Sequence, residues 1–84
     1  MYRIVPDEAV IEQLAALPAE ALAAFANVID VLELTPWNGE PQHEDNPDGA
    51  VRRWHFGPNR GGQLIYLIDE HEQVVHLLLV QWIG

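Results

Sequence analysis

Residues 63–82 read QLIYLIDEHEQVVHLLLVQW, and this stretch decides the fold. Residues 63–68 are apolar at both alternating sets of positions, which is typical of a strand that is buried on both faces and central in its sheet. Residues 74–82 form a second, longer apolar run. The polar residues 69–73 between the two runs predict a hairpin loop, so the runs predict a pair of antiparallel strands.

A third strand is predicted immediately upstream, over residues 51–56. Its side chains alternate between an aromatic face and a more polar face. The aromatic face carries Trp54 and Phe56, and the other face carries Val51, Arg53 and His55. The segment 57–62 (GPNRGG) predicts an exposed turn. Residues 51–82 therefore predict a three-stranded antiparallel meander.

The N-terminal part predicts a short strand followed by two helices. Residues 2–6 form a strand that stops at a proline, and Asp7 stands where it can cap a helix over residues 8–17. Pro18 interrupts this helix and suits the first turn of a second helix that ends near Leu34. The two segments predict a helical hairpin.

The elements together predict an α+β fold with the order β-α-α-β-β-β, in which the helical hairpin packs on one face of a small antiparallel sheet. The second helix has an apolar stripe at helical spacing, formed by Leu22, Phe25, Ile29 and Leu32. The side chains expected to be buried in the core are Phe25, Ile29, Trp54, Phe56, Tyr66 and Leu78.

Residues 35–50 separate the helices from the meander and contain three prolines and two glycines without any period. They predict a loop longer than the roughly 12–15 residues above which loops are usually functional or disordered. Trp37 is its large apolar residue and is expected to hold the loop against the core.

Composition narrows the classes of function. The chain has 84 residues, enough for one domain over residues 1–84, and no cysteine, which excludes thiolate nucleophiles and cysteine-based zinc sites. Its net charge is −9, with four arginines and no lysine, which argues against autonomous binding to DNA, RNA or anionic lipid. No apolar run approaches the roughly 20 residues of a membrane span and no signal peptide is visible, so we expect a cytoplasmic protein without membrane contact.

Arg53 and His55 share one face of their strand, roughly 6–7 Å apart along the chain, and Arg60 lies in the adjoining turn. Cleavage of RNA by attack of a 2′-hydroxyl needs a base, an acid and cations that stabilise the phosphorane. Arginines supply such cations, and histidine can transfer a proton near neutral pH. The alternative is that both residues form the solvated face of a half-buried strand.

A metal site is a second possibility that the spacing disfavours. The long loop gathers His43, Glu44, Asp45 and Asp48, while His71 and His76 lie elsewhere in the chain. The acids lack the spacing of a calcium loop, and the histidines lack the spacing of a helical zinc site. We expect an acidic, solvated loop, and neither a metal nor a cofactor.

The predicted order of elements, in a chain of this length, resembles the RelE/ParE superfamily of bacterial toxin–antitoxin systems. The resemblance covers nearly the whole chain. It is carried by the end of the first helix at residues 14–17, LELTP at 32–36, RRWHFG at 52–57, LIYLI at 64–68 and LLVQW at 78–82. The family usually has basic residues at alternate positions before a glycine, then a tyrosine in the next strand. Arg53, His55, Gly57 and Tyr66 stand at these positions.

The resemblance implies a toxin of a type II toxin–antitoxin pair that cleaves mRNA on the ribosome and thereby inhibits translation. The implied catalytic residues are Arg53, His55 and Arg60, with Tyr66 as a substrate contact. The arginines would hold the scissile phosphate and His55 would transfer a proton. The implied partners are a cognate antitoxin, the ribosome and mRNA.

Three departures from the family pattern favour a different function. Gln63 stands where the family has an arginine, the net charge is strongly negative, and the sequence ends just after the last strand, without the C-terminal basic or aromatic groups of many ribosome-dependent members. The alternative is a non-catalytic, ParE-like or degenerate module that binds a protein target or an antitoxin. A domain unrelated to toxins that shares the scaffold is a third possibility.

Overall fold

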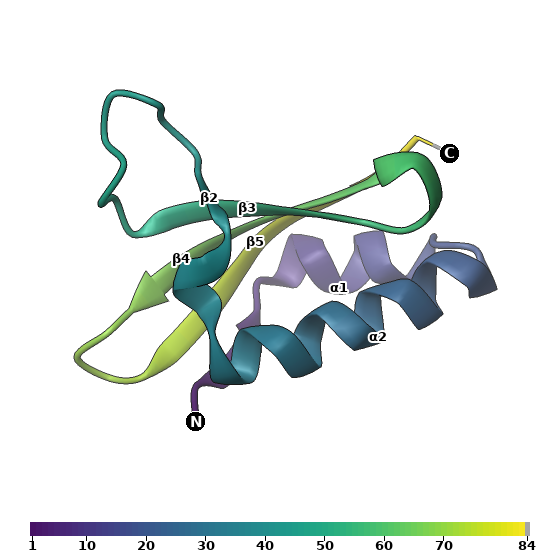
Figure 1. Cartoon of the computed structure of the whole chain (residues 1–84). Coiled ribbons are helices and arrows are strands. Elements are labelled where there is room, and N and C mark those ends of the chain that lie inside the picture. The colour runs from purple at the N-terminus through teal and green to yellow at the C-terminus, as the bar shows by residue number, and fades with distance from the viewer. Residues whose placement is uncertain (84) are drawn as a thin grey trace.

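The computed structural model describes residues 1–83, in which two helices lie on one side of a sheet (Figure 1). The helices are α1 (Glu8–Ala15) and α2 (Ala19–Leu34). The strands of this part of the chain are β1 (Arg3–Pro6), β2 (Glu40–Pro41), β3 (Val51–Phe56), β4 (Gly62–Asp69) and β5 (Val74–Trp82). The predicted α+β class and order of elements are confirmed, with β2 as an addition.

The strands lie in the order β1-β5-β4-β3-β2, so the doubly apolar strand β4 is central, as predicted. Strands β3, β4 and β5 form the predicted antiparallel meander. Strand β1 pairs in parallel with β5, Ile4 standing opposite Val75, which corrects the expectation of a wholly antiparallel sheet. Parallel neighbours need a long connection, and here the chain between β1 and β5 passes through both helices and strands β2 to β4.

Pro18 separates the two helices and sets where one ends and the other begins. Helix α1 ends at Ala15, and the amides of Ala16 and Leu17 continue it with tighter hydrogen bonds to the carbonyls three residues back. Pro18 precedes α2, as predicted. Asp7 stands at the start of α1, but within residues 1–83 its side chain makes no capping hydrogen bond. Its carbonyl oxygen instead accepts the amides of the first turn, so the predicted side-chain cap is wrong.

The buried stripe of α2 is shifted from the predicted one. Phe25 and Leu32 are buried as predicted, but they are joined by Ala21 and Val28, and Ile29 is only partly buried. Leu22 is 43% exposed, so its place on the predicted stripe does not put it in the core. Consecutive residues lie about 100° apart around a helix, so the face that buries Ala21 turns Leu22 toward solvent.

A β-bulge in β5 decides which of its leucines enters the core. Ile65 pairs with Leu79 but Tyr66 pairs with Leu77, so Leu78 is the inserted residue. Leu78 is 39% exposed, and its predicted burial is wrong. Leu77 before the bulge and Val80 after it are buried instead, together with the predicted Phe56 and Tyr66, while Trp54 is half-buried.

The segment between α2 and β3 is more ordered than a plain loop. It begins with a short 3-10 helix, η1 (Pro36–Asn38), and continues into the two-residue strand β2 before it extends away from the helices (Figure 1). The Trp37 indole donates to the Glu70 carboxylate at 2.6 Å and packs under the Arg52 guanidinium at 5.1 Å. Trp37 therefore holds the segment in place through its contacts with two charged side chains, Glu70 and Arg52. No helix within residues 1–83 is long and apolar enough to cross a membrane.

Candidate functional site

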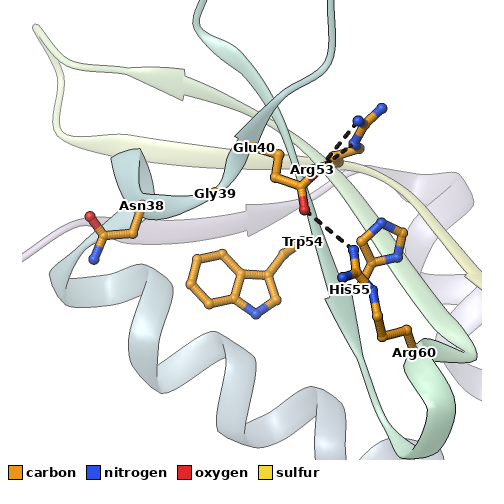
Figure 2. Close-up of a pocket in the computed structure, with 7 residues that line it drawn as sticks. All are labelled: Asn38, Gly39, Glu40, Arg53, Trp54, His55 and Arg60. Carbon is orange, nitrogen blue, oxygen red and sulfur yellow. Dashed lines mark hydrogen bonds and ion pairs between the residues drawn. The ribbon is translucent and has the colours of Figure 1, made fainter. Parts of the chain in front are cut away.

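Three of the four residues predicted for the site line one pocket at the edge of β3. Strand β2 pairs with only Arg52 and Arg53, so the edge of β3 beyond Arg53 is open. The pocket there has a volume of about 260 Å³. Its lining, shown in Figure 2, is Asn38, Gly39, Glu40, Arg53, Trp54, His55 and Arg60. Arg53 and His55 reach it by the predicted alternation of β3.

Arg60 reaches the same pocket because of an unusual turn. It ends the short helix η2 (Pro58–Arg60), in which Asn59 and Arg60 both have positive φ angles near 57°. The preceding Gly57 has φ 80°, and a Cβ added there would press against the Trp82 ring. Left-handed backbone at non-glycine residues is strained by about 1 kcal/mol or more, and it turns this arginine toward Glu40.

Glu40 lies between the two arginines. Its Oε2 accepts hydrogen bonds from Nε and Nη2 of Arg53, both at 3.3 Å, and its Oε1 lies 3.3 Å from Nη2 of Arg60. Figure 2 shows the carboxylate directed toward both side chains. The hydrogen bond from Arg53 lowers the pKa of Glu40, and the charges of Arg53, Arg60 and His55 lower it further. Glu40 therefore remains ionised and offsets one of the two positive charges.

Sequence reasoning did not find Glu40. Its place in the site depends on the pairing of residue 40 with residue 53, and segment 35–50 has no period that predicts a strand. The two-residue strand β2 forms because residues 40–41 run beside β3, and a pairing of this length leaves no pattern in the sequence.

Tyr66 is not part of the pocket. It is fully buried on the helix-facing side of the sheet, and its hydroxyl donates to the Pro36 carbonyl at 2.7 Å. Burial raises the pKa of the Tyr66 hydroxyl well above its ordinary value, so the group remains a donor. The expected contact between Tyr66 and a substrate is not available to this side chain. Its hydroxyl instead anchors the segment that leads to Gly39 and Glu40.

Arg52 is a second structural residue that the sequence did not single out. It is 7% exposed, and its guanidinium donates to three backbone carbonyls rather than to a carboxylate. The acceptors are Gly39 at 3.0 Å, Pro47 at 2.7 Å and Gly49 at 3.0 Å. Arg52 therefore ties both ends of the long loop to β3, next to the pocket.

The long loop is exposed to solvent, as predicted. His43, Glu44, Asp45 and Asp48 are all exposed. In the described part of the chain, no three side chains of histidine, aspartate or glutamate come together in a way that could hold a metal ion.

Comparisons with known proteins connect this fold to one group of structures. No protein-family model and no curated protein matches the sequence. The isolated RelE toxin of E. coli superposes with a TM-score of 0.81 at 13% identity, over 100% of this chain and 86% of that one. The RelBE2 toxin–antitoxin complex of Mycobacterium tuberculosis gives 0.75 at 22% identity, over 98% of each chain. An archaeal RelE–RelB complex from Pyrococcus horikoshii gives 0.66 at 20% identity, over 99% of this chain and 96% of that one.

These likenesses show the fold. The chain has a RelE/ParE-like fold, as its order of elements indicated: two helices packed on one face of a mostly antiparallel sheet. Function must be argued from the site, because one fold can carry several activities.

Proposed function

We propose that this protein is the toxin component of a type II toxin–antitoxin-like pair, with a protein antitoxin as its partner. The RelE/ParE-like fold supports the proposal, because several of its structural neighbours are toxin–antitoxin complexes. The finer part of the proposal is that the protein cleaves mRNA on the ribosome and so inhibits translation.

The observation that carries the finer part is the convergence of Arg53, His55 and Arg60 on one open pocket. The two guanidinium groups can hold a phosphate and stabilise the charge that develops on it during attack by the 2′-hydroxyl. The His55 imidazole can transfer a proton to or from the reacting oxygens. The three groups thus supply the cations and the proton carrier that this reaction needs.

Two observations favour the alternative, a non-catalytic module that binds a protein partner. Glu40 already pairs with both arginines, and the net charge of −9 repels free RNA. A protein partner avoids this repulsion if it docks through apolar contacts and basic side chains.

A translation assay with purified ribosomes separates the two functions. The wild type should shorten mRNA and slow translation, whereas Arg53→Ala and His55→Ala should each lose most of this activity. Arg3→Ala removes an exposed arginine of β1 and should remain active, which controls for the change in charge. If the wild type neither cleaves mRNA nor slows translation, the cleavage of mRNA is rejected and the non-catalytic binding module remains as the function. Active Arg53→Ala and His55→Ala variants would remove this pocket from the mechanism.

The antitoxin is tested separately from catalysis. If a small open reading frame lies beside this gene, its product is the candidate partner, and co-expression of the two proteins should yield a stable complex. Addition of that protein to the translation assay should restore protein synthesis. A neighbouring protein that neither binds nor neutralises would contradict the proposed pair.

A further inference from the structure

The Glu40 carboxylate lies where an external anion would have to bind, between Arg53 and Arg60. We propose that Glu40 is an internal competitor for the phosphate groups of RNA, so that a phosphate enters the pocket by displacing this carboxylate from the two arginines. The inference rests on the proposed function, because it takes RNA as the ligand of the pocket.

The geometry shows that the arginine pair accepts an anion with two oxygens. Each carboxylate oxygen of Glu40 faces a different arginine, at 3.3 Å in both cases. Carboxylate and phosphate both offer two oxygens to guanidinium donors, so they compete for the same N–H groups. Either ligand can therefore satisfy Arg53 and Arg60, but both cannot use the same donors at once.

The Glu40 side chain can leave without disturbing the fold. It is 52% exposed and belongs to an edge strand of two residues. The backbone on each side is held independently, because Arg52 binds the Gly39 carbonyl and the Gln42 amide binds the Val51 carbonyl, both at 3.0 Å. Displacement of the carboxylate thus requires a side-chain rotation, with the pocket wall kept in place.

Competition by the Glu40 carboxylate explains how an acidic protein can act on RNA only when the RNA is held next to the pocket. A phosphodiester carries a single negative charge, so exchanging it for the Glu40 carboxylate brings little net electrostatic gain. Free RNA should therefore bind weakly. An mRNA strand held beside the pocket by a ribosome presents its phosphate at a high effective concentration, and the exchange then becomes favourable.

The test is a direct binding measurement that does not depend on catalysis. The probe is a fluorescein-labelled RNA decamer with 2′-O-methyl groups, which lacks the attacking hydroxyl, and binding is followed by fluorescence anisotropy at low salt. Glu40→Gln keeps the shape of the side chain but removes its charge. It should bind about three- to tenfold more tightly than wild type, as expected for the release of two exposed ion pairs.

Glu44→Gln is the matched control, because it removes the same charge from an exposed residue four positions along the chain. Its affinity should change less than about twofold, because screening weakens the effect of distant exposed charges. In the double variant Glu40→Gln/Arg60→Ala, the gain should be lost. Glu40→Asp keeps the charge on a shorter side chain and should give a smaller gain than Glu40→Gln.

The outcomes separate this inference from the proposed function. Tighter binding by Glu40→Gln with an inactive wild type in the translation assay would uphold the competition by Glu40 and reject the nuclease. Equal gains for Glu40→Gln and Glu44→Gln would overturn the inference, because general charge would then explain both. A gain that persists in the double variant would also overturn it, because the RNA would bind elsewhere.

Discussion

The hydroxyl of Tyr66 donates a hydrogen bond to the carbonyl oxygen of Pro36, 2.7 Å away, and both residues are buried. This bond joins the centre of the sheet to the point where the chain leaves α2. Gly39, three residues later, has no room for a side chain, because a Cβ there would collide with the same hydroxyl and with the Arg53 carbonyl. The wall of the pocket is therefore positioned by a buried residue that does not itself line it.

Tyr66→Phe should lower the free energy of unfolding by about 1–2 kcal/mol, because it leaves the buried Pro36 carbonyl without its partner. Tyr2→Phe is the matched control, since the Tyr2 hydroxyl bonds to Glu70 in an exposed position. It should cost less than about 1 kcal/mol. Urea unfolding followed by tryptophan fluorescence measures both, and equal losses would contradict the structural role of the buried bond.

Phe25→Ala should cost about 3–5 kcal/mol, which would unfold much of so small a protein. Phe25 is buried and packs against Phe56 with ring centroids 5.8 Å apart. Leu22→Ala, in the same helix, should cost less than about 1 kcal/mol because Leu22 lies at the surface, outside the buried core. Thermal unfolding followed by circular dichroism compares the two variants. A larger loss of stability for Leu22→Ala than for Phe25→Ala would show that Leu22 belongs to the buried stripe after all.

The sequence predicted the helices and strands more accurately than it predicted which of their side chains face the core. The central position of β4 could be predicted because a strand apolar on both faces is best shielded when neighbouring strands flank it on both sides. The buried stripe of α2 could not be predicted in the same way. Alanines flank it, and either Ala21 or Leu22 stands at a helical spacing from the next residues of the stripe. The bulge was hidden for a similar reason, since residues 77–79 are three identical leucines and nothing in them marks Leu78 as the inserted one.

The sequence predicted the part of the candidate site that is formed by residues close together in the chain. It missed the part that depends on contacts between residues far apart in the chain. Arg53, His55 and Arg60 belong to one strand and the turn after it, so local alternation brings them together. Glu40 joins them through a pairing across the long loop, which no local pattern reveals. The burial of Tyr66 was predicted and is confirmed, but the role of its hydroxyl was hidden, because it depends on a contact with Pro36, thirty residues away in the chain.

The Glu70 carboxylate predicts a dependence of stability on pH. It accepts hydrogen bonds from the Tyr2 hydroxyl, the Trp37 indole and the Gln73 amide, joining the N-terminus, η1 and the β4–β5 turn. These bonds, that from Tyr2 foremost, lower the pKa of Glu70 below its ordinary value of 4.5. The stabilisation is therefore present above pH 4.5 and is lost as the pH falls through the lowered pKa.

Glu70→Gln should reduce the loss of stability on acidification, because the variant has no carboxylate to protonate there. Urea midpoints at pH 7, 5 and 3 should fall more steeply for wild type than for Glu70→Gln. Glu72→Gln, in the same exposed turn, should follow the wild-type profile. Parallel profiles for all three proteins would contradict a special role for Glu70.

Arg52→Lys should loosen the long loop while the sheet stays intact. A lysine ammonium cannot reproduce the fork of donors with which Arg52 binds the carbonyls of Gly39, Pro47 and Gly49. The loss should be about 1.5–3 kcal/mol, the range for hydrogen bonds to a charged group. Hydrogen exchange should accelerate at the Gly49 amide, within the loop, and remain slow at the amides of β4.

Arg3→Lys makes the same substitution at an exposed arginine of β1 and should leave exchange unchanged. The comparison also bears on the pocket, because the Gly39 carbonyl held by Arg52 directly precedes Glu40. Once that carbonyl is released, the Glu40 carboxylate is less well fixed between Arg53 and Arg60, and Arg52→Lys should bind the RNA probe more tightly than Arg3→Lys. Unchanged exchange at Gly49 would mean that this end of the loop is held by other contacts, such as the hydrogen bond from the Ile68 amide to the Ala50 carbonyl, and would contradict the anchoring role of Arg52.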